Sequence, residues 1–382
     1  MKNRTLIAVF LVGFFSQAQT ALYNSGNLRI HSNGQLGFHT NLINDNTFDQ
    51  NQGLAGFYGA NALNVSGAFV PQFFDVEVAV TNGLFLNTGL ASENNTNFIV
   101  GDVVTPRNQP DVFYHFLQDA FFVGEGNATK IDGYAAVSGQ QNFSFPVGDA
   151  VFLRPLILNA TGTTPFAKAA YFFENPNSPT TFPAFDTERR PRTLGPVSTV
   201  EFWRLEGETS ASISISWNER SNIAALNADV NTIIPVGWSK TGNIWVSLGV
   251  TARGGDLSQG FVTSENFVPD SYEIITFGSL ATPEDILTLD NYIVTPNGDG
   301  INDELIIPEL ELSPNNNVRI FDRNGLLVFE MQNYTNEFNG FANTGSLVIN
   351  REAGLPQGVY FYLVSLDDLG MDFQGFLYLS TK

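Results

Sequence analysis

Apolar and polar side chains alternate in short stretches along most of this chain. Between residues 74 and 80 the even-numbered positions are apolar, whereas Asp75 and Glu77 occupy two of the odd-numbered ones. A period of two is typical of a β-strand that has one buried face and one face in water. Further short runs, separated by Gly and Asn, lie at residues 97–104, 112–116, 120–123 and 134–137. The pattern predicts an all-β protein.

Asn-Gly pairs predict tight turns between several of these runs. Asn33 and Gly34 separate residues 28–32 from residues 35–38, which predicts a hairpin with a type I′ turn, because both residues tolerate a positive φ. The spacing of the runs up to residue 150 is compatible with a β-sandwich or with an irregular stack resembling a β-helix. Because no strict repeat period is visible, we expect the sandwich.

The four tryptophans all lie in the next part of the chain, at positions flanked by alternating apolar residues. They are Trp203, Trp217, Trp238 and Trp245. Large aromatic rings in this pattern are typical of a sandwich core, and this is the interpretation that we adopt. The alternative is an exposed aromatic platform for sugars, which would require the rings to lie at the surface.

The N-terminus has the features of a secretory signal peptide over residues 1–18. Two basic residues precede an apolar run at residues 6–15, and Ser16 and Ala18 supply the small residues of a cleavage site. The run is too short for a permanent membrane span, and no later stretch reaches about 18 consecutive apolar residues. We therefore predict an exported protein without a transmembrane segment.

Residues 292–382 contain four short motifs. The first is a turn made of Pro296, Asn297, Gly298, Asp299, Gly300, Asn302 and Asp303. The second contains Phe321, Asp322, Asn324 and Gly325, and the third contains Leu355, Pro356, Gly358, Tyr360 and Tyr362. The fourth is the run at residues 375–379. Together the motifs make this region resemble the gliding-motility-associated C-terminal domain of Bacteroidetes, which is the type B sorting signal read by the type IX secretion system.

The resemblance implies a route and a partner rather than an activity. It implies that the type IX secretion machinery recognises the protein and carries it to the cell surface or into the medium. One departure from the family is Phe338, where the family usually has Trp. An aromatic ring is retained at this position, so we expect the packing to be kept.

Alternation also marks strands within this C-terminal region, at residues 318–321, 326–329, 359–364 and 376–379. In the third of these runs we expect Val359, Phe361 and Leu363 to face the core. Tyr360 and Tyr362 would then face water. A region of this length, with about seven strands, fits a small immunoglobulin-like sandwich.

The first motif is also a candidate metal site. Its oxygen ligands would come from Asn297, Asp299, Asn302 and Asp303, which are grouped around two glycines as Ca²⁺ prefers. An EF-hand would require a Glu at its twelfth position, where Ile306 stands, so the loop is not an EF-hand. The alternative, which we favour, is a turn whose Asn and Asp side chains bond their own backbone. Apart from this Ca²⁺ candidate we predict no cofactor.

Composition and charge narrow the function classes further. With 18 Lys plus Arg against 38 Asp plus Glu, the formal charge of −20 argues against binding to a nucleic-acid backbone. No Cys is present, which excludes disulfides and thiolate metal sites. Motifs of metalloproteases, serine hydrolases, phosphate loops and dinucleotide sites are missing from the sequence. A glycosidase needs only two carboxylates, for which Glu201, Glu206 and Glu208 are available.

These observations predict a secreted, all-β protein built of several β-sandwiches, with an immunoglobulin-like sorting domain. The expected parts are a signal peptide at 1–18, a β domain at 19–150, a second β-sandwich at 151–280, a linker at 281–291 and the sorting domain at 292–382. We expect no enzyme, but a binding or assembly protein that supports gliding or adhesion, like the small accessory proteins of gliding adhesins. It would dock on a surface adhesin or an outer-membrane protein. The alternative is a carbohydrate-binding or carbohydrate-active surface protein.

Overall fold

The computed structural model describes residues 20–281, 291–307, 310, 313–344, 354–366 and 371–380. Regular structure in these residues is almost entirely β, so the all-β prediction is confirmed. The helices of the described part are short 3₁₀ turns at Glu219–Ser221, Ile223–Ala225, Val230–Thr232 and Pro269–Ser271. The predicted signal peptide lies outside the described residues.

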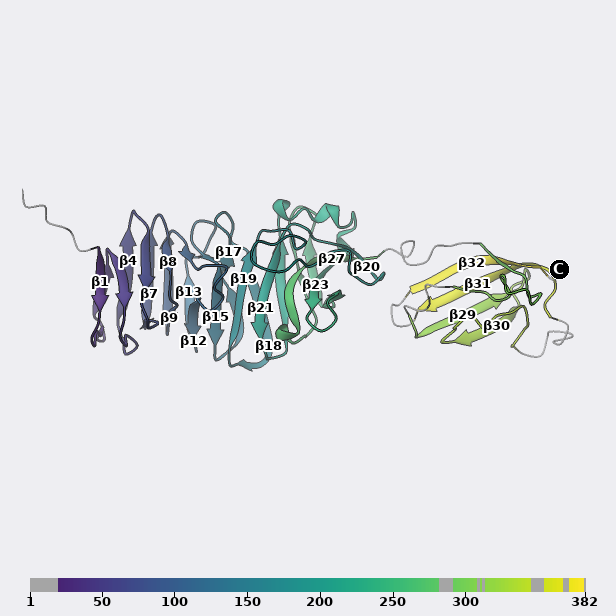
Figure 1. The fold of residues 1–382 in the computed structure, drawn as a ribbon, viewed down its shortest axis with the longest axis horizontal. Helices are drawn as coiled ribbons and strands as arrows, with labels where there is room; N and C mark the ends of the chain where they lie inside the picture. Colours follow the sequence, from purple (N-terminus) through teal and green to yellow (C-terminus); the bar gives the residue numbers. More distant parts are fainter. Residues whose placement is uncertain are drawn as a thin grey trace, which may run out of the picture.

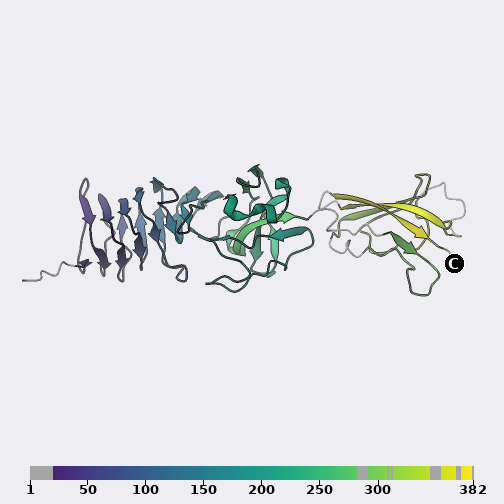
Figure 2. The ribbon, with the colours of Figure 1, turned by 90° about the horizontal axis from the view of Figure 1, so that it is seen from above.

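Apart from residues 140–145, which join an antiparallel sheet, residues 21–148 form a parallel β-helix, in which each strand stacks on the equivalent strand of a neighbouring coil (Figures 1 and 2). Three sheets line the coils. Sheet A contains β1 (Ala21–Asn24), β3 (Asn41–Asn44), β5 (Leu63–Ser66), β8 (Leu84–Leu86), β11 (Val103–Val104), β14 (Ile131–Asp132) and β17 (Val147–Gly148). Sheet B contains β2 (Gln35–Phe38), β4 (Leu54–Gly59), β7 (Asp75–Val80), β10 (Asn95–Val100) and β13 (Phe121–Val123). Sheet C begins with β6 (Gln72–Phe73), β9 (Leu90–Ser92), β12 (Tyr114–Leu117) and β15 (Tyr134–Ser138).

The β-helix shows that the expected N-terminal sandwich is wrong. The coils differ in length: Leu84 pairs with Val103, 19 residues later, whereas Val103 pairs with Ile131, 28 residues later. Strands therefore recur without a fixed period, and alternation alone does not reveal which of them stack.

The predicted hairpin at Asn33 and Gly34 is also wrong. Asn33 has the expected positive φ of 62°, and the amide of Gly34 donates to the carbonyl of His31 over 2.8 Å. This turn lies within one coil, however, because β2 pairs in parallel with β4 of the next coil. A local turn signal thus identified a bend, but not the partner of the strand that follows it.

Aromatic rings and hydrogen-bonded amides fill the interior of the first coils. Phe38 stacks on Phe57 of the next coil, with ring centroids 4.7 Å apart. Asn24 and Asn44 occupy equivalent positions, and the Asn24 amide donates to Asn44 Oδ1 over 2.6 Å. Asn44 in turn donates to the carbonyl of Phe69 over 2.9 Å. Each buried amide therefore bonds the neighbouring coil, which avoids the cost of an unpaired polar group.

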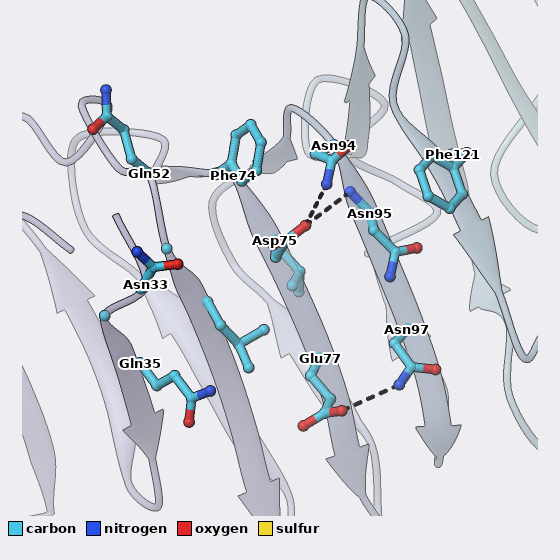
Figure 3. Close-up of a pocket in the computed structure, with 14 residues that line it drawn as sticks. Asn33, Gln35, Gln52, Phe74, Asp75, Glu77, Asn94, Asn95, Asn97 and Phe121 are labelled. Carbon is cyan, nitrogen blue, oxygen red and sulfur yellow. Dashed lines mark hydrogen bonds between the residues drawn. The ribbon is translucent and has the colours of Figure 1, made fainter. Parts of the chain in front are cut away.

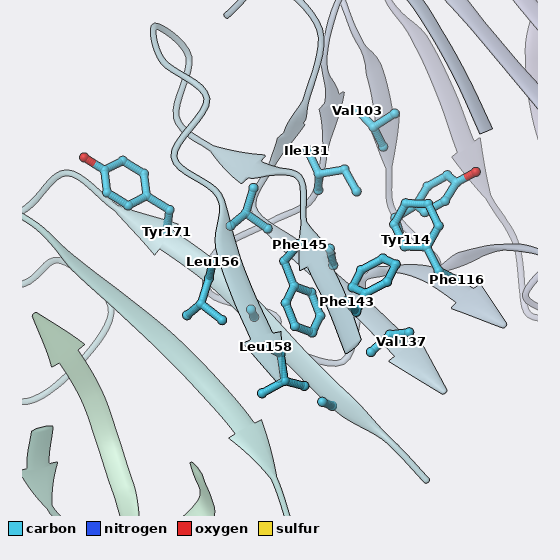
Figure 4. Close-up of a cluster of buried hydrophobic side chains, with 14 of the residues drawn as sticks. Val103, Tyr114, Phe116, Ile131, Val137, Phe143, Phe145, Leu156, Leu158 and Tyr171 are labelled. Carbon is cyan, nitrogen blue, oxygen red and sulfur yellow. The ribbon is translucent and has the colours of Figure 1, made fainter. Parts of the chain in front are cut away.

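Sheet C continues beyond the β-helix with antiparallel pairing. It adds β19 (Ala167–Phe172), β21 (Phe202–Gly207), β27 (Tyr272–Leu280), β23 (Ile233–Ser239) and β24 (Trp245–Ser247), and β20 (Leu194–Val197) pairs with β27. Sheet D contains β16 (Gln140–Phe145), β18 (Leu156–Thr164), β22 (Ala211–Trp217), β26 (Gly260–Thr263) and β25 (Ala252–Gly255). One buried cluster runs from Ile30 to Phe277, and Figure 4 shows its aromatic rings where the two architectures meet. The core thus crosses residue 150, where the expected domain boundary falls.

All four tryptophans are buried in this antiparallel part, as the sandwich-core interpretation requires. The ring of Trp203 contacts Phe277 edge to face, with centroids 5.5 Å apart. The guanidinium of Arg154 lies 5.4 Å from the Trp203 ring and binds both carboxylate oxygens of Glu201, at 2.7 and 2.8 Å. The alternative of a tryptophan platform for sugars is therefore excluded.

The described residues after 290 form sheet E, which has its own buried cluster. Its strands, in order, are β28 (Tyr292–Val294), β32 (Met371–Leu379), β31 (Gly358–Leu366), β29 (Asn316–Phe321) and β30 (Leu327–Gln332). β28 pairs in parallel with β32, and the other pairs are antiparallel. An immunoglobulin-like sandwich stays a prediction for this region.

The two faces of β31 are the reverse of those predicted. Tyr360 and Tyr362 are buried, whereas Val359 and Phe361 are exposed, Phe361 to 51%. The hydroxyl of Tyr360 donates to the carbonyl of Pro356 over 2.7 Å, which satisfies the polar end of a buried tyrosine. Alternation predicted the strand correctly, but it could not assign the faces because both carry large apolar or aromatic side chains.

Candidate binding face and sorting motifs

The outward face of sheet B carries two rows of side chains that run across the coils. The first row consists of Gln35, Leu54, Asp75, Asn95 and Phe121. The second consists of Gly37, Gly56, Glu77, Asn97 and Val123. Neighbouring strands lie about 4.8 Å apart, so each row of five positions spans about 19 Å. Equivalent positions of successive coils thus form a continuous strip.

A hollow of about 580 Å³ lies over this strip (Figure 3). Asp75 and Glu77 project from one strand beside Asn95 and Asn97 of the next, as Figure 3 shows. Further side chains from the loops also line the hollow, namely Asn33, Gln52, Phe74 and Asn94. None of the lining residues is Lys, Arg or His. The hollow is therefore polar and acidic.

Hydrogen bonds between coils hold the two carboxylates in place. Asp75 Oδ1 accepts from the side-chain amide of Asn94 over 2.7 Å and from the backbone amide of Asn95 over 3.3 Å. Glu77 Oε1 accepts from the Asn97 amide over 3.1 Å, and Glu77 Oε2 accepts from the hydroxyl of Tyr58. These hydrogen bonds within the protein fix the positions of both carboxylates.

The ring of Tyr58 lies flat over Gly56, a position in the second row where no side chain fills the space. A Cβ atom at Gly56 would come within 2.2 Å of the Tyr58 ring, so a larger residue there would displace the ring. The ring of His39 lies beside it, with centroids 5.6 Å apart. Burial, followed by the hydrogen bond to Glu77, raises the pKa of Tyr58 to about 12. The phenol therefore stays protonated and presents a flat, neutral ring next to the carboxylates.

A sequence signal for this face exists, although the alternation pattern did not reveal it. Asp75 and Asn95 are separated by 20 residues, and so are Glu77 and Asn97. These pairs stack because one coil takes 20 residues at this point. The strip could have been recognised from polar residues that recur at intervals of one coil, at the strand positions whose side chains face outward.

The first sorting motif is a turn closed by Asp303. Its Oδ1 accepts from the backbone amides of Asn297 and Gly298, at 2.9 and 2.7 Å, and its Oδ2 accepts from that of Gly300 at 2.8 Å. These backbone hydrogen bonds, led by that of Gly298, lower the pKa of the Asp303 carboxyl. Asp299 Oδ1 likewise accepts from the amide of Ile301 over 2.8 Å. Both carboxylates therefore bond their own turn.

The candidate Ca²⁺ site lies in this same turn. Asn302 adopts a positive φ of 57°, which helps to close the loop, and its carbonyl accepts from the amide of Thr295 over 2.7 Å. In the part of the chain that the structure describes, no three His, Cys, Asp or Glu side chains are grouped so as to hold a metal. A Ca²⁺ ion here stays the less favoured of the two interpretations.

The second and third motifs also build turns and core. Asp322 Oδ1 accepts from the amides of Asn324 and Leu326, both at 2.8 Å, and these bonds lower the pKa of Asp322. Gly325 completes this turn with a φ of 80°. Leu355 is buried in the core of sheet E. The motifs thus shape the surface turns and the interior of one small sheet.

The carboxylates that the sequence offers for catalysis lie elsewhere. Glu201 is buried in its ion pair with Arg154. Glu206 bonds Lys168 at 3.0 Å and Arg204 at 2.9 Å, and Glu208 is exposed. None of these three lines the hollow over sheet B.

Comparison with known proteins identifies the C-terminal region. Residues 287–379 match the family described as CHU_C Type IX secretion signal domain. This signal means that the type IX secretion machinery exports the protein to the cell surface or the outside. Neither a curated protein nor a solved structure matches the chain. Within the described ranges, no helix has the length and apolarity needed to cross a membrane.

Proposed function

We propose that this chain is a cell-surface binding protein, not an enzyme, and that the outward face of sheet B makes its ligand contacts. The observation that carries the proposal is the hollow over Asp75, Glu77, Asn95 and Asn97. These side chains stand on adjacent coils and are already fixed by hydrogen bonds. A face that is ordered in advance loses little conformational entropy on binding.

The similarity of the two carboxylate environments supports a binding role. A glycosidase assigns different roles to two carboxylates by giving them different surroundings. Asp75 and Glu77 each accept a hydrogen bond from an Asn side chain of the neighbouring coil and one further hydrogen bond. We therefore assign them to ligand recognition.

The proposed biological role is in gliding or surface adhesion, as a small accessory of an adhesin. Among the described residues, β1 and β2 are terminal strands of sheets A and B. A terminal strand presents unpaired backbone N–H and C=O groups, to which a strand of another protein can add. A surface adhesin or an outer-membrane protein would dock there, and the strip on sheet B would remain accessible.

Recovery of partners from native cell envelopes tests this proposal. The tagged mature protein is gently cross-linked on cells and purified, and its partners are identified by mass spectrometry. A double variant with Asn95→Ala and Asn97→Ala is compared with a matched double variant, Ser212→Ala and Ser214→Ala, on sheet D. We expect every variant to recover the surface protein that docks on β1 or β2, whereas the first variant loses surface components held by the strip that the second variant retains. Recovery of the secretion machinery alone by every variant would contradict the proposal.

A further inference from the structure

We propose that the hollow over sheet B binds a neutral polysaccharide whose chain runs across the strands, along the axis of the β-helix. This inference rests on the proposed function, because it names the ligand class of the same face. The alternatives are an acidic polysaccharide and a protein segment, and the experiments below separate these three ligands.

The repeat of the strip matches an extended sugar chain. Equivalent side chains recur about every 4.8 Å from coil to coil, which is close to the rise of one sugar ring in an extended β-linked chain. The row from Gln35 to Phe121 spans about 19 Å, enough for about four rings. Successive coils can therefore offer similar contacts to successive sugars.

The polar groups in the hollow suit hydroxyl groups. A sugar hydroxyl both donates and accepts, so it can bond a carboxylate oxygen and a side-chain amide at the same time. Asp75 and Glu77 supply the acceptors, and Asn97 and Gln35 supply amides.

Aromatic rings flank the polar strip. Tyr58 lies flat on the sheet over Gly56, and Phe74 and Phe121 line the hollow, with Phe121 exposed to 50%. The C–H face of a sugar ring packs against an aromatic face, while its hydroxyl groups bond the polar residues around it. This combination distinguishes the strip from a merely acidic surface.

Charge decides between neutral and acidic polymers. The lining contains Asp75 and Glu77 but no basic residue, and the whole chain has a formal charge of −20. A uronic-acid polymer would therefore meet like charges along its length. A protein strand is also disfavoured here, because the backbone groups of the inner strands of sheet B are paired within the sheet.

Affinity electrophoresis of the mature chain in native gels tests the ligand class. The gels contain hydroxyethylcellulose, xyloglucan or galactomannan as neutral polymers, or polygalacturonate as the acidic one. We expect at least one neutral polymer to retard the protein and polygalacturonate to have no effect. No retardation by any of the three neutral polymers, or retardation by polygalacturonate alone, would overturn the inference.

Point variants locate the site on the protein. We expect Tyr58→Ala and Phe121→Ala each to weaken the retardation about tenfold, as the loss of an aromatic contact implies, while Tyr58→Phe keeps most of it. Phe261→Ala is the matched control, because Phe261 is exposed to 44% on sheet D. Circular dichroism verifies that each variant is folded. If Phe121→Ala and Phe261→Ala change the retardation equally, the sugar-binding site does not lie on sheet B.

The two sets of experiments separate the ligand class from the proposed function. If no neutral polymer binds, but Asn95→Ala with Asn97→Ala still removes an envelope protein from the purified complex, the ligand is a protein. The polysaccharide inference then falls, while the proposed function stands. If the variants change neither the retardation in the gels nor the recovered partners, both the polysaccharide inference and the proposed function are wrong.

Discussion

The β-helix and the sorting domain place their polar residues in opposite ways. In the β-helix, strands about one coil apart in sequence lie side by side, so Asp75, Glu77 and their Asn partners form rows on an open face. In the sorting domain, Asp303 and Asp322 use their carboxylates to bond the amides of their own turns. The β-helix thus arranges polar groups in rows on an open face, whereas the sorting domain uses them to close its own turns.

The two regions also have separate interiors. The side chains of the β-helix and of the antiparallel part share one large buried cluster, a smaller cluster around Trp238 and Trp245 packs within the antiparallel part, and sheet E has its own. Export depends on the second region, and we propose that ligand binding depends on the first. Changes in one region should therefore leave the role of the other intact.

The largest expected effect concerns export. Deleting residues 292–382 removes most of the segment that matches the secretion signal, so the protein should remain in the periplasm. Labelling of intact cells with an antibody against a tag should fall to background. Tyr58→Ala, which leaves the signal intact, should be labelled like the wild type. Undiminished labelling of the truncated protein would contradict the assignment.

The next effect concerns the two cores. Phe57→Ala and Tyr362→Ala each remove a buried ring and should cost about 3–5 kcal/mol of unfolding free energy. Because the clusters are separate, urea unfolding should show two transitions, and each variant should shift only one of them. Intrinsic fluorescence reports on the first region, since all four tryptophans lie there. A shift of both transitions by either variant would show that the regions are coupled.

A smaller effect distinguishes the two faces of β31. Phe361→Ser changes an exposed ring, so its effect on stability should stay within about 0.5 kcal/mol. Tyr362→Ser should cost several times more, because Tyr362 is only 3% exposed. Urea unfolding of the two variants measures the difference. Equal losses would mean that the faces are not as described.

Acid sensitivity gives a further test within the β-helix. Burial lowers the pKa of His115 to about 4, whereas an unfolded chain has a His pKa of about 6.5. Between these values the unfolded chain binds a proton that the folded chain does not, so stability falls as the pH drops, by up to about 1.4 kcal/mol per pH unit. His115→Gln should flatten this part of the stability profile. An unchanged slope would contradict the burial of the ring.

The smallest effect tests the pairing of Tyr58 with Glu77. Glu77→Gln should lower the pKa of Tyr58 from about 12, but not to that of a free tyrosine, because burial is the larger cause of the shift. NMR of ring-labelled tyrosine measures this titration, and Tyr58→Phe assigns the signal. An unchanged value would show that the two side chains do not interact.

Much of the local structure could be predicted from the sequence. Alternation located the strand that contains Asp75 and Glu77, the aromatic pattern predicted the buried tryptophans, and the motifs from Pro296 onward indicated the sorting signal. Each of these inferences depends on neighbours that are close in sequence. Such neighbours share a strand or a turn whatever the tertiary fold is.

The stacking of coils could not be predicted in the same way. Pairing between Val103 and Ile131 depends on the length of the intervening loops, which varies from coil to coil. The buried and exposed faces of β31 were assigned the wrong way round, because Tyr360 and Phe361 are both aromatic and only the rest of the core decides which of them is buried. To recognise the strip on sheet B, one must know both which strands stack and which face of each strand points outward. It therefore became visible only in the three-dimensional structure.

Photocross-linking from the strip tests the central claim most directly. A photoreactive phenylalanine analogue replaces Phe121 in one variant and Phe261 in another, so that each keeps an aromatic ring, and each mature protein is irradiated on native cell envelopes. We expect a ligand adduct from position 121, which lines the hollow, and none from position 261 on sheet D. Adducts from position 261 alone, or equally from both positions, would show that sheet B is not the binding face.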